Sequence, residues 1–248
     1  MDGSGRWSAV ADAWAELWGP FAAQVWPPLL TAAQVGKGTR VLDVGCGTGE
    51  LVGHLARAGA VAAGVDPAPA MVGRARGRNP GATVREGDAE HLPFEDDSFD
   101  AVLAVNALQL ADDVEDALAE AARVLVPGGR VGIAGWAEGA RNDLDVVERA
   151  VAAAYEEDVP PDGPLRAAGG LESALGGAGF EVVGSGIVGV PWAVPDGDRL
   201  VRGVLLGEDE RTMTELAPTV LDAAAPFRTP GGGHRLANAF RWAVGRAP

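Results

Sequence analysis

A glycine-rich turn is the part of the sequence whose residue types point most directly to ligand binding. Residues 41–49 read VLDVGCGTG, so a short apolar run leads into glycines at Gly45, Gly47 and Gly49. Glycines let the chain turn sharply from a strand into a helix, and they let a ligand lie against bare backbone near the N–H groups at the helix start. The spacing predicts a ligand-binding loop between a strand and a helix.

Two acidic residues follow at the ends of the next two apolar runs. Asp66 comes directly after residues 60–65, and Asp88 comes just after residues 83–86. An acid at the end of the second strand accepts hydrogen bonds from ribose hydroxyls in nucleotide-binding sheets. Asp88 can accept from an adenine amine, with the Ala89 N–H available to a ring nitrogen. Either acid alone could be a helix cap, but a glycine loop and two acids on successive strands predict an adenosine site.

The residue after the last glycine separates two kinds of adenosine ligand. A dinucleotide-binding fingerprint has Gly or Ala at the sixth position of its motif, where this chain has Glu50. A carboxylate there is unfavourable beside a pyrophosphate. We therefore treat an NAD-dependent dehydrogenase as the weaker alternative.

Strands and helices alternate from residue 40 onward, and these elements must position the loop and the acids. Strands are expected near 41–44, 60–65, 83–86, 101–105, 130–136, 180–183 and 239–244. Nearly continuous apolar strands are typical of a parallel sheet covered by helices on both faces. We expect the α/β class, with a Rossmann-like, seven-stranded and mostly parallel sheet.

The first 35 residues carry an aromatic helical face. Trp7, Trp14, Trp18 and Phe21 are spaced seven, four and three residues apart, which places them on one side of a helix. We expect segment 1–35 to be a helical lid on a binding domain of residues 36–248, although the rings could simply pack on the sheet. The less regular stretches 139–170 and 191–233 are expected to be insertions or lid elements.

Several motifs together resemble the class I S-adenosylmethionine (SAM)-dependent methyltransferases, in particular those of quinone and natural-product biosynthesis. The motifs are LDVGCGTG at 42–49, GVDP at 64–67, GDAEHLPF at 87–94, FDAV at 99–102 and RVLVPGGR at 123–130. The resemblance is specific over residues 38–136 and looser elsewhere. It implies an enzyme that uses SAM, releases S-adenosylhomocysteine and methylates a small molecule.

The resemblance also implies which residues would hold the cofactor. The set is Asp43 ordering the loop, Gly45, Cys46 and Gly47 at the methionine part, Asp66 at the ribose, Pro67 and Met71 near the adenine, Asp88 and Ala89 at the adenine edge, and Asn106 at the amino-acid moiety. Many relatives have a histidine near the position of Gln109, which cannot act as a base. No catalytic residue is therefore predicted, Cys46 is expected to be inert, and His234, in a glycine-rich insertion, is expected to be exposed.

The acceptor pocket is expected among the N-terminal helices, the loop after the fourth strand and the insertions. Candidate wall residues are Trp7, Trp14, Trp18, Gln109, Tyr155 and Trp192. Methyl transfer is an in-line displacement that depends mainly on positioning, and a general base is needed only if the acceptor must lose a proton. Because fold does not fix chemistry, a SAM-binding module or cofactor-assisted cyclase that transfers no methyl stays an alternative.

Composition limits the partners. The net charge is -15 over 248 residues, and no basic run suits a phosphate backbone, so we expect no nucleic-acid partner. A single cysteine excludes an intrachain disulfide. No apolar run approaches the ~20 residues that a membrane span needs, and no leader is recognised, so a cytoplasmic protein is expected. No metal site is expected, and the sequence does not determine the oligomeric state.

Overall fold

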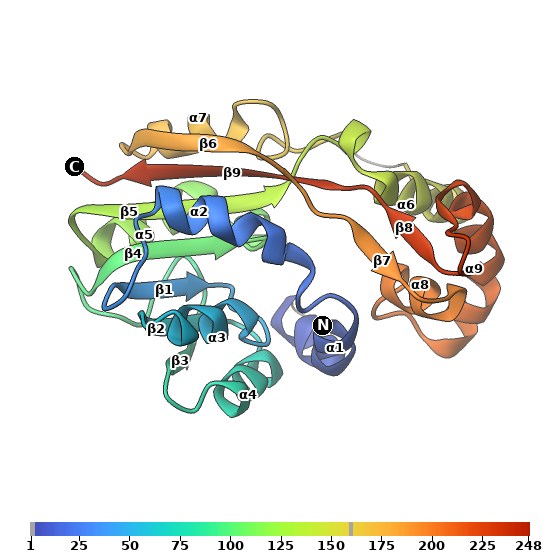
Figure 1. The fold of residues 1–248 in the computed structure, drawn as a ribbon, viewed down its shortest axis with the longest axis horizontal. Coiled ribbons are helices and arrows are strands. Elements are labelled where there is room, and N and C mark those ends of the chain that lie inside the picture. Colours follow the sequence, from blue (N-terminus) through green and yellow to red (C-terminus); the bar gives the residue numbers. More distant parts are fainter. Residues whose placement is uncertain (1–2, 159–160) are drawn as a thin grey trace.

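The computed structural model describes residues 3–158 and 161–248, and its main sheet is drawn in Figure 1. The strands of this sheet are β1 (Arg40–Val44), β2 (Val61–Asp66), β3 (Thr83–Glu86), β4 (Phe99–Val105), β5 (Leu125–Trp136), β6 (Glu181–Gly189) and β9 (Ala239–Arg246). Their order is β3-β2-β1-β4-β5-β9-β6. The first five are mutually parallel, and β9 runs antiparallel to both β5 and β6. The predicted seven-stranded, mostly parallel α/β sheet is confirmed.

Helices cover both faces of this sheet because the central strands carry apolar residues on both sides. The covering helices are α2 (Trp26–Ala32), α3 (Glu50–Arg57), α4 (Pro69–Arg78), α5 (Val114–Val124) and α7 (Gly170–Gly177). Leu29, Val52 and Leu55 belong to the core on one face, whereas Leu118 and Leu175 belong to the core on the other. Since β1 to β5 are parallel, their carboxyl ends meet at one edge of the sheet, where α/β proteins bind ligands.

Prolines divide the N-terminal segment into short helices. Helix α1 (Gly3–Leu17) ends before Pro20, the 3-10 helix η1 (Phe21–Val25) follows, and α2 carries Pro27 and Pro28 in its first turn. In Figure 1, α2 lies across the sheet while α1 lies between α4 and the elements on the right. Residues 1–2 of the expected 1–35 segment lie outside the described residues.

The two irregular stretches fold together into what we call the cap. It comprises α6 (Asp143–Ala154), β7 (Trp192–Val194), α8 (Gly197–Val204), α9 (Glu210–Ala223), η4 (Ala225–Phe227) and β8 (His234–Leu236). The cap has its own apolar core, to which Leu17 at the end of α1 and the following Trp18 contribute. Within the described chain, no helix is both long and apolar enough to span a bilayer.

His234 corrects one expectation. The glycine-rich sequence around His234 predicted an exposed side chain, but His234 is only 2% exposed to solvent. His234 pairs with Val194 across β7 and β8, and directly opposed residues of such a pair lie on the same face. Pairing of the two short strands therefore turns the imidazole into the cap.

Candidate functional site

The glycine loop lies at the carboxyl end of β1 and is fastened to the end of β2. The backbone N–H groups of Gly45 and Cys46 both donate to the Val65 carbonyl, at 2.9 and 3.0 Å. Gly45 has a φ of +69°, and a Cβ built on it would lie 2.4 Å from the Cβ of Ala107. Only glycine fits this position, because the loop after β1 touches the loop after β4.

Asp66 holds the same loop from the end of β2. Its carboxylate accepts hydrogen bonds from the N–H groups of Gly47 at 2.8 Å and Ala68 at 2.9 Å. The residue is 7% exposed, and burial raises the pKa of Asp66 against the lowering effect of these two donors. A carboxylate has about four lone-pair positions, so Asp66 retains acceptor capacity for ligand hydroxyls.

The loop has an acidic and buried surrounding. Burial, with the negative charges of Asp66 and Glu50, raises the pKa of Asp43 well above its usual value. Burial and the nearby acids also raise the pKa of the Cys46 thiol. A thiol held in its neutral form is a poor nucleophile, and the acidic surrounding favours a cationic ligand.

Glu50, the first residue of α3, is held by Thr48 and Arg78. The Thr48 hydroxyl donates to its carboxylate at 2.7 Å, and Arg78 of α4 forms an ion pair with it at 2.8 Å. The carboxylate is thus tied to α4, and it adds negative charge where a dinucleotide would bring its pyrophosphate.

Asp88 lies on the neighbouring strand end. Asp66 pairs with Glu86 in the register of β2 and β3, and the Gly87 N–H donates to the Asp66 carbonyl at 3.2 Å. Asp88 is therefore two residues beyond the partner of Asp66, and its side chain is exposed beside His91. The parallel pairing brings both predicted acids to one edge of the sheet.

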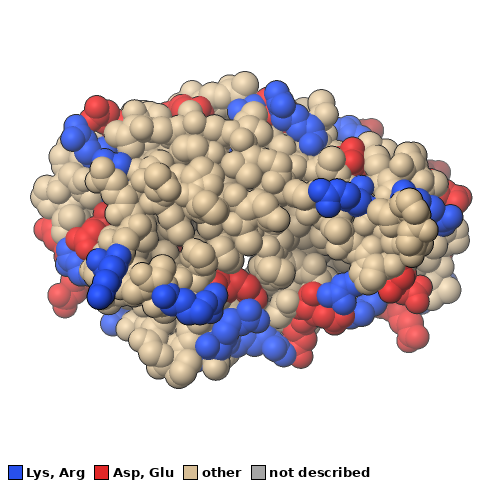
Figure 2. All heavy atoms as spheres, viewed as in Figure 1, with Lys and Arg blue, Asp and Glu red and all other residues tan. Residues whose placement is uncertain are grey.

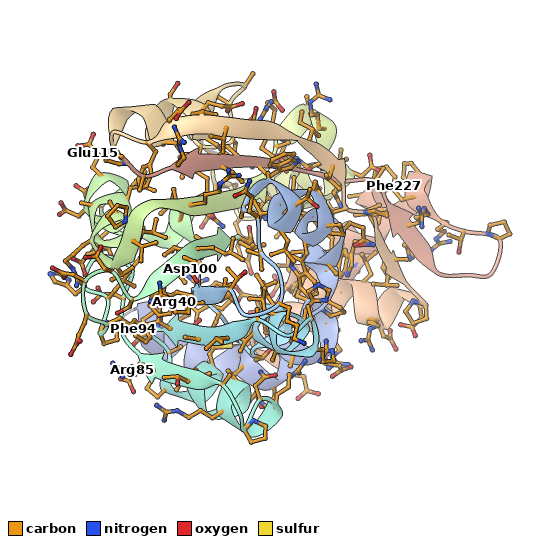
Figure 3. The ribbon with its side chains drawn as sticks, turned by 60° about the vertical axis from the view of Figure 1, so that its left-hand side comes forward. Arg40, Arg85, Phe94, Asp100, Glu115 and Phe227 are labelled. Atoms are coloured by element: carbon orange, nitrogen blue, oxygen red, sulfur yellow. The ribbon has the colours of Figure 1, made fainter. Side chains whose placement is uncertain are left out.

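Two contacts support the loop that carries Asp88 and Ala89. The guanidinium of Arg85 lies over the ring of Phe94, 4.7 Å from its centroid (Figure 3). Such a cation–π contact contributes about 0.5–1 kcal/mol at exposed sites. Ala89 also packs on the core of the sheet. Sequence analysis did not identify Arg85 as a supporting residue. The available signal was its position in the expected strand 83–86, just before Asp88 and Ala89.

Asn106 ends β4 in an unusual conformation. Its φ is +56°, its N–H donates to the Ala134 carbonyl at 2.7 Å, and its side-chain oxygen accepts from Gln109 at 2.9 Å. Asparagine tolerates the left-handed region better than most residues. The structure therefore brings Asn106 and Gln109 together on the loop that touches Gly45.

The aromatic face of α1 covers the glycine loop and the start of α4. A Cβ built on Gly47 would lie 3.7 Å from Trp14 Nε1, and nothing else is within 4 Å of that position. Trp7 and Trp14 pack with Met71, while Pro67 is exposed at the turn before α4. Two predicted acceptor residues, Trp7 and Trp14, are thus placed beside the predicted cofactor residues.

Charged side chains alternate along this side of the molecule. Asp12 of α1 forms an ion pair with Arg74 of α4, next to the pair between Arg78 and Glu50. Figure 2 shows basic and acidic groups lying side by side on the lower margin of the molecule, over α3, α4 and α1. The pair of Asp12 and Arg74 therefore joins α1 to α4, and that of Glu50 and Arg78 joins α3 to α4.

The other predicted acceptor residues lie further away. Trp18 and Trp192 are buried in the core of the cap and stack on each other. Tyr155 is exposed at the end of α6, with its hydroxyl beside Thr212 of α9. Sequence analysis missed Trp136, which packs on Phe21 and Phe240 at the end of β5. Its position as the last residue of a predicted strand was the available signal.

Comparison with curated proteins identifies a domain. Residues 42–133 match the model of a family described as a methyltransferase domain. The chain is 34% identical over 176 residues to an uncharacterised protein of Mycobacterium tuberculosis, covering 69% of this chain and 61% of that relative. It is 44% identical over 102 residues to a demethylmenaquinone methyltransferase of Tropheryma whipplei, covering 39% and 41%. The chain thus spans less than two thirds of the length of these relatives.

Solved structures share the fold at low sequence identity. A SAM-dependent methyltransferase of Thermotoga maritima superposes with a TM-score of 0.59 and 21% identity, over 99% of both chains. The cyclase SpnF superposes with a TM-score of 0.57 and 21% identity, over 90% of this chain and 80% of that one. Both likenesses concern the fold.

Proposed function

We propose, from the premise that residues 42–133 match a methyltransferase domain, that this chain transfers a methyl group from SAM to a small-molecule acceptor. The observation that carries the proposal is the junction at the ends of β1, β2 and β3. There Asp66 holds the glycine loop through Gly47, and the pairing of the strands sets Asp88 beside it.

The residues at this junction fit the cofactor. A buried carboxylate with spare acceptor positions suits the two ribose hydroxyls, which would bind Asp66. Asp88 and the Ala89 N–H would bind the adenine edge, with Pro67 and Met71 against the ring. The methionine half would lie on Gly45, Cys46 and Gly47. SAM carries a sulfonium and an ammonium group, and the carboxylates of Glu50 and Asp66 at the loop favour such cations.

The protein would act mainly by positioning and by excluding water. SAM supplies an already activated methyl group, so the barrier depends on holding the acceptor in line with it. Trp14 lies beside Gly47, with Trp7 packed against it, and the two rings would keep water away from the reacting atoms. Asn106 and Gln109 would order the loop after β4 at the methionine end.

The N-terminal helix would serve as the lid, and the acceptor would bind between α1 and the cap. Trp7, Trp14 and Gln109 are the candidate residues that can touch an acceptor, whereas Trp18 and Trp192 would support the wall from within the cap. The aromatic chain from Trp14 through Trp18 to Trp192 favours an apolar or aromatic acceptor. Tyr155, on the outer side of α6, would lie apart from it.

A second candidate function is cofactor binding without methyl transfer. The fold of this chain is shared with the cyclase SpnF, and a fold does not determine a reaction. The junction described above supports SAM binding equally under both functions. Transfer itself is therefore the property that separates them.

The test combines calorimetry with methyl labelling. Titration of the purified protein with SAM and with S-adenosylhomocysteine is expected to give heats that fit one site, and Asp66→Asn is expected to weaken both by about tenfold or more. Asp196→Asn is the matched control, because Asp196 also accepts a backbone N–H but caps α8. Labelled methyl on a quinone-like or other aromatic acceptor supports transfer.

Two results would contradict the proposal in different ways. No binding heat from folded protein overturns the cofactor assignment. Tight binding without methyl transfer to any acceptor of a broad aromatic panel favours the second candidate function instead.

A further inference from the structure

The backbone donors of the glycine loop are already engaged within the protein. The N–H groups of Gly45 and Cys46 donate to the Val65 carbonyl, and that of Gly47 donates to Asp66. The Gly49 N–H donates to the Cys46 carbonyl at 2.9 Å. The loop therefore offers few donors of its own to an anionic group of a ligand.

An anionic group at this loop would also meet negative charge. The carboxylate of Asp66 accepts from the Gly47 N–H, and that of Glu50 accepts from the Thr48 hydroxyl, so both lie at the loop. Arg78 of α4 is already paired with Glu50. Like charges at short range in a partly buried site repel strongly. A carboxylate bound here thus needs a hydrogen-bond donor from outside the loop.

Trp14 presents such a donor. Its Nε1 lies 3.7 Å from the position of a Cβ on Gly47. Within residues 3–158 and 161–248, the Trp14 indole N–H makes no hydrogen bond, whereas the indole N–H of Trp18, just beyond the end of α1, donates to the Gly203 carbonyl at 3.1 Å. An indole nitrogen can only donate, so Trp14 has an unused donor beside the loop.

The ring of Trp14 is fixed on two sides. Trp7 meets it edge-on at 5.2 Å between ring centroids, and Trp18 stacks on it at 6.3 Å. The helix itself is tied to the cap, because Glu16 accepts from both Arg199 and Arg202 of α8. A donor that is already oriented loses little conformational entropy when it binds.

We propose that the indole N–H of Trp14 donates a hydrogen bond to the carboxylate of the methionine half of the cofactor. The inference rests on the proposed function, since Gly45 to Gly47 are the residues assigned to that half. It makes Trp14 a specificity residue for the amino-acid part of the ligand. It also links the N-terminal helix to cofactor occupancy.

The test compares two ligands that differ in the amino-acid part. S-adenosylhomocysteine carries the carboxylate, whereas 5′-methylthioadenosine has the same adenosine and a thioether but no carboxylate. Trp14→Phe keeps an aromatic ring and removes the donor, so it is expected to weaken S-adenosylhomocysteine by about tenfold while 5′-methylthioadenosine changes by less than about twofold. Calorimetry measures both affinities.

Trp7→Phe is the matched control, because Trp7 belongs to the same ring cluster and does not contact Gly47. It is expected to leave the ratio of the two affinities unchanged. Equal losses for both ligands in Trp14→Phe, or no loss for either, overturn the inference. Wild-type protein that binds neither ligand overturns the proposed function instead.

A second measurement follows ligand binding in the wild-type protein. The indole ¹H–¹⁵N signal of Trp14, assigned by its absence in Trp14→Phe, is expected to shift on addition of S-adenosylhomocysteine and to shift much less with 5′-methylthioadenosine. If Trp14→Phe does not fold, selective labelling of the wild type with assignment through neighbouring signals serves the same purpose. An equal shift with both ligands contradicts the hydrogen bond.

Discussion

The indole ring of Trp18 lies flat on that of Trp192, with 4.2 Å between ring centroids and 17° between planes. Trp18 directly follows the N-terminal helix α1, Trp192 belongs to the cap, and both are buried. A Cβ on Gly203 would lie 2.5 Å from the Trp192 ring, so the stack is enclosed by α8 as well. The pair joins the segment over the cofactor loop to the insertion that forms the cap.

Trp192→Ala is expected to lower the free energy of unfolding by about 3–5 kcal/mol, because it removes a large buried ring and leaves a cavity against Trp18. Urea unfolding followed by circular dichroism measures the loss. Trp7→Ala is the control, since Trp7 is only partly buried and should cost clearly less. Equal losses in the two variants would show that the stack contributes little.

Gly45→Ala is expected to disrupt the cofactor loop, because the new Cβ would lie 2.4 Å from the Cβ of Ala107. Gly38→Ala is the matched control: Gly38 also has a positive φ, +83°, but a Cβ there meets nothing within 4 Å. The control should cost only the backbone strain of about 1–2 kcal/mol and leave SAM affinity unchanged. Similar affinities in both variants would argue against a close contact between the two loops.

Deletion of residues 1–35 is expected to unfold the protein. The segment includes Leu17, Trp18, Val25 and Leu29, which are buried in the cores of the sheet and the cap. Deletion of residues 1–13 leaves these four buried residues in place, so the remaining chain should fold and bind SAM more weakly. Thermal melting and calorimetry check both deletions. A folded 36–248 fragment would contradict the packing described here.

His234→Leu is expected to raise stability and to flatten its dependence on pH. Both ring nitrogens of His234 are buried without a hydrogen-bond partner among the described residues, and burial with the charge of Arg228 lowers its pKa. His234 therefore binds a proton in the unfolded chain at a pH where it stays neutral in the folded chain. The free energy of unfolding consequently decreases as the pH falls below about 6.5.

Melting temperatures at about pH 7.5 and 5.5 check this expectation. The gain should be about 1–3 kcal/mol from removal of the unpartnered polar atoms, and it should be larger at the lower pH. His91→Leu is the control, because the His91 side chain is exposed beside Asp88. A gain in His234→Leu that is no larger at low pH would mean that the imidazole is not held neutral by burial.

The sheet and the glycine loop were predictable because their signals are local. Gly45, Gly47 and Gly49 indicate a tight turn independently of the rest of the sequence. Nearly continuous apolar runs indicate buried parallel strands. Asp66 and Asp88 follow from the same pattern, since parallel strands bring their carboxyl ends to one edge. Pro20 likewise separated the N-terminal helices through its own backbone geometry.

Only the tertiary structure decided which aromatic residues face the cofactor loop. Helical spacing placed Trp14 and Trp18 on one face, but their different surroundings come from segments far along the chain: the Trp18 hydrogen bond to Gly203 spans 185 residues. The burial of His234 has the same origin, because a three-residue strand carries too weak a local pattern to be recognised. Its direction is set by pairing with β7, a contact that exists only once the cap has packed.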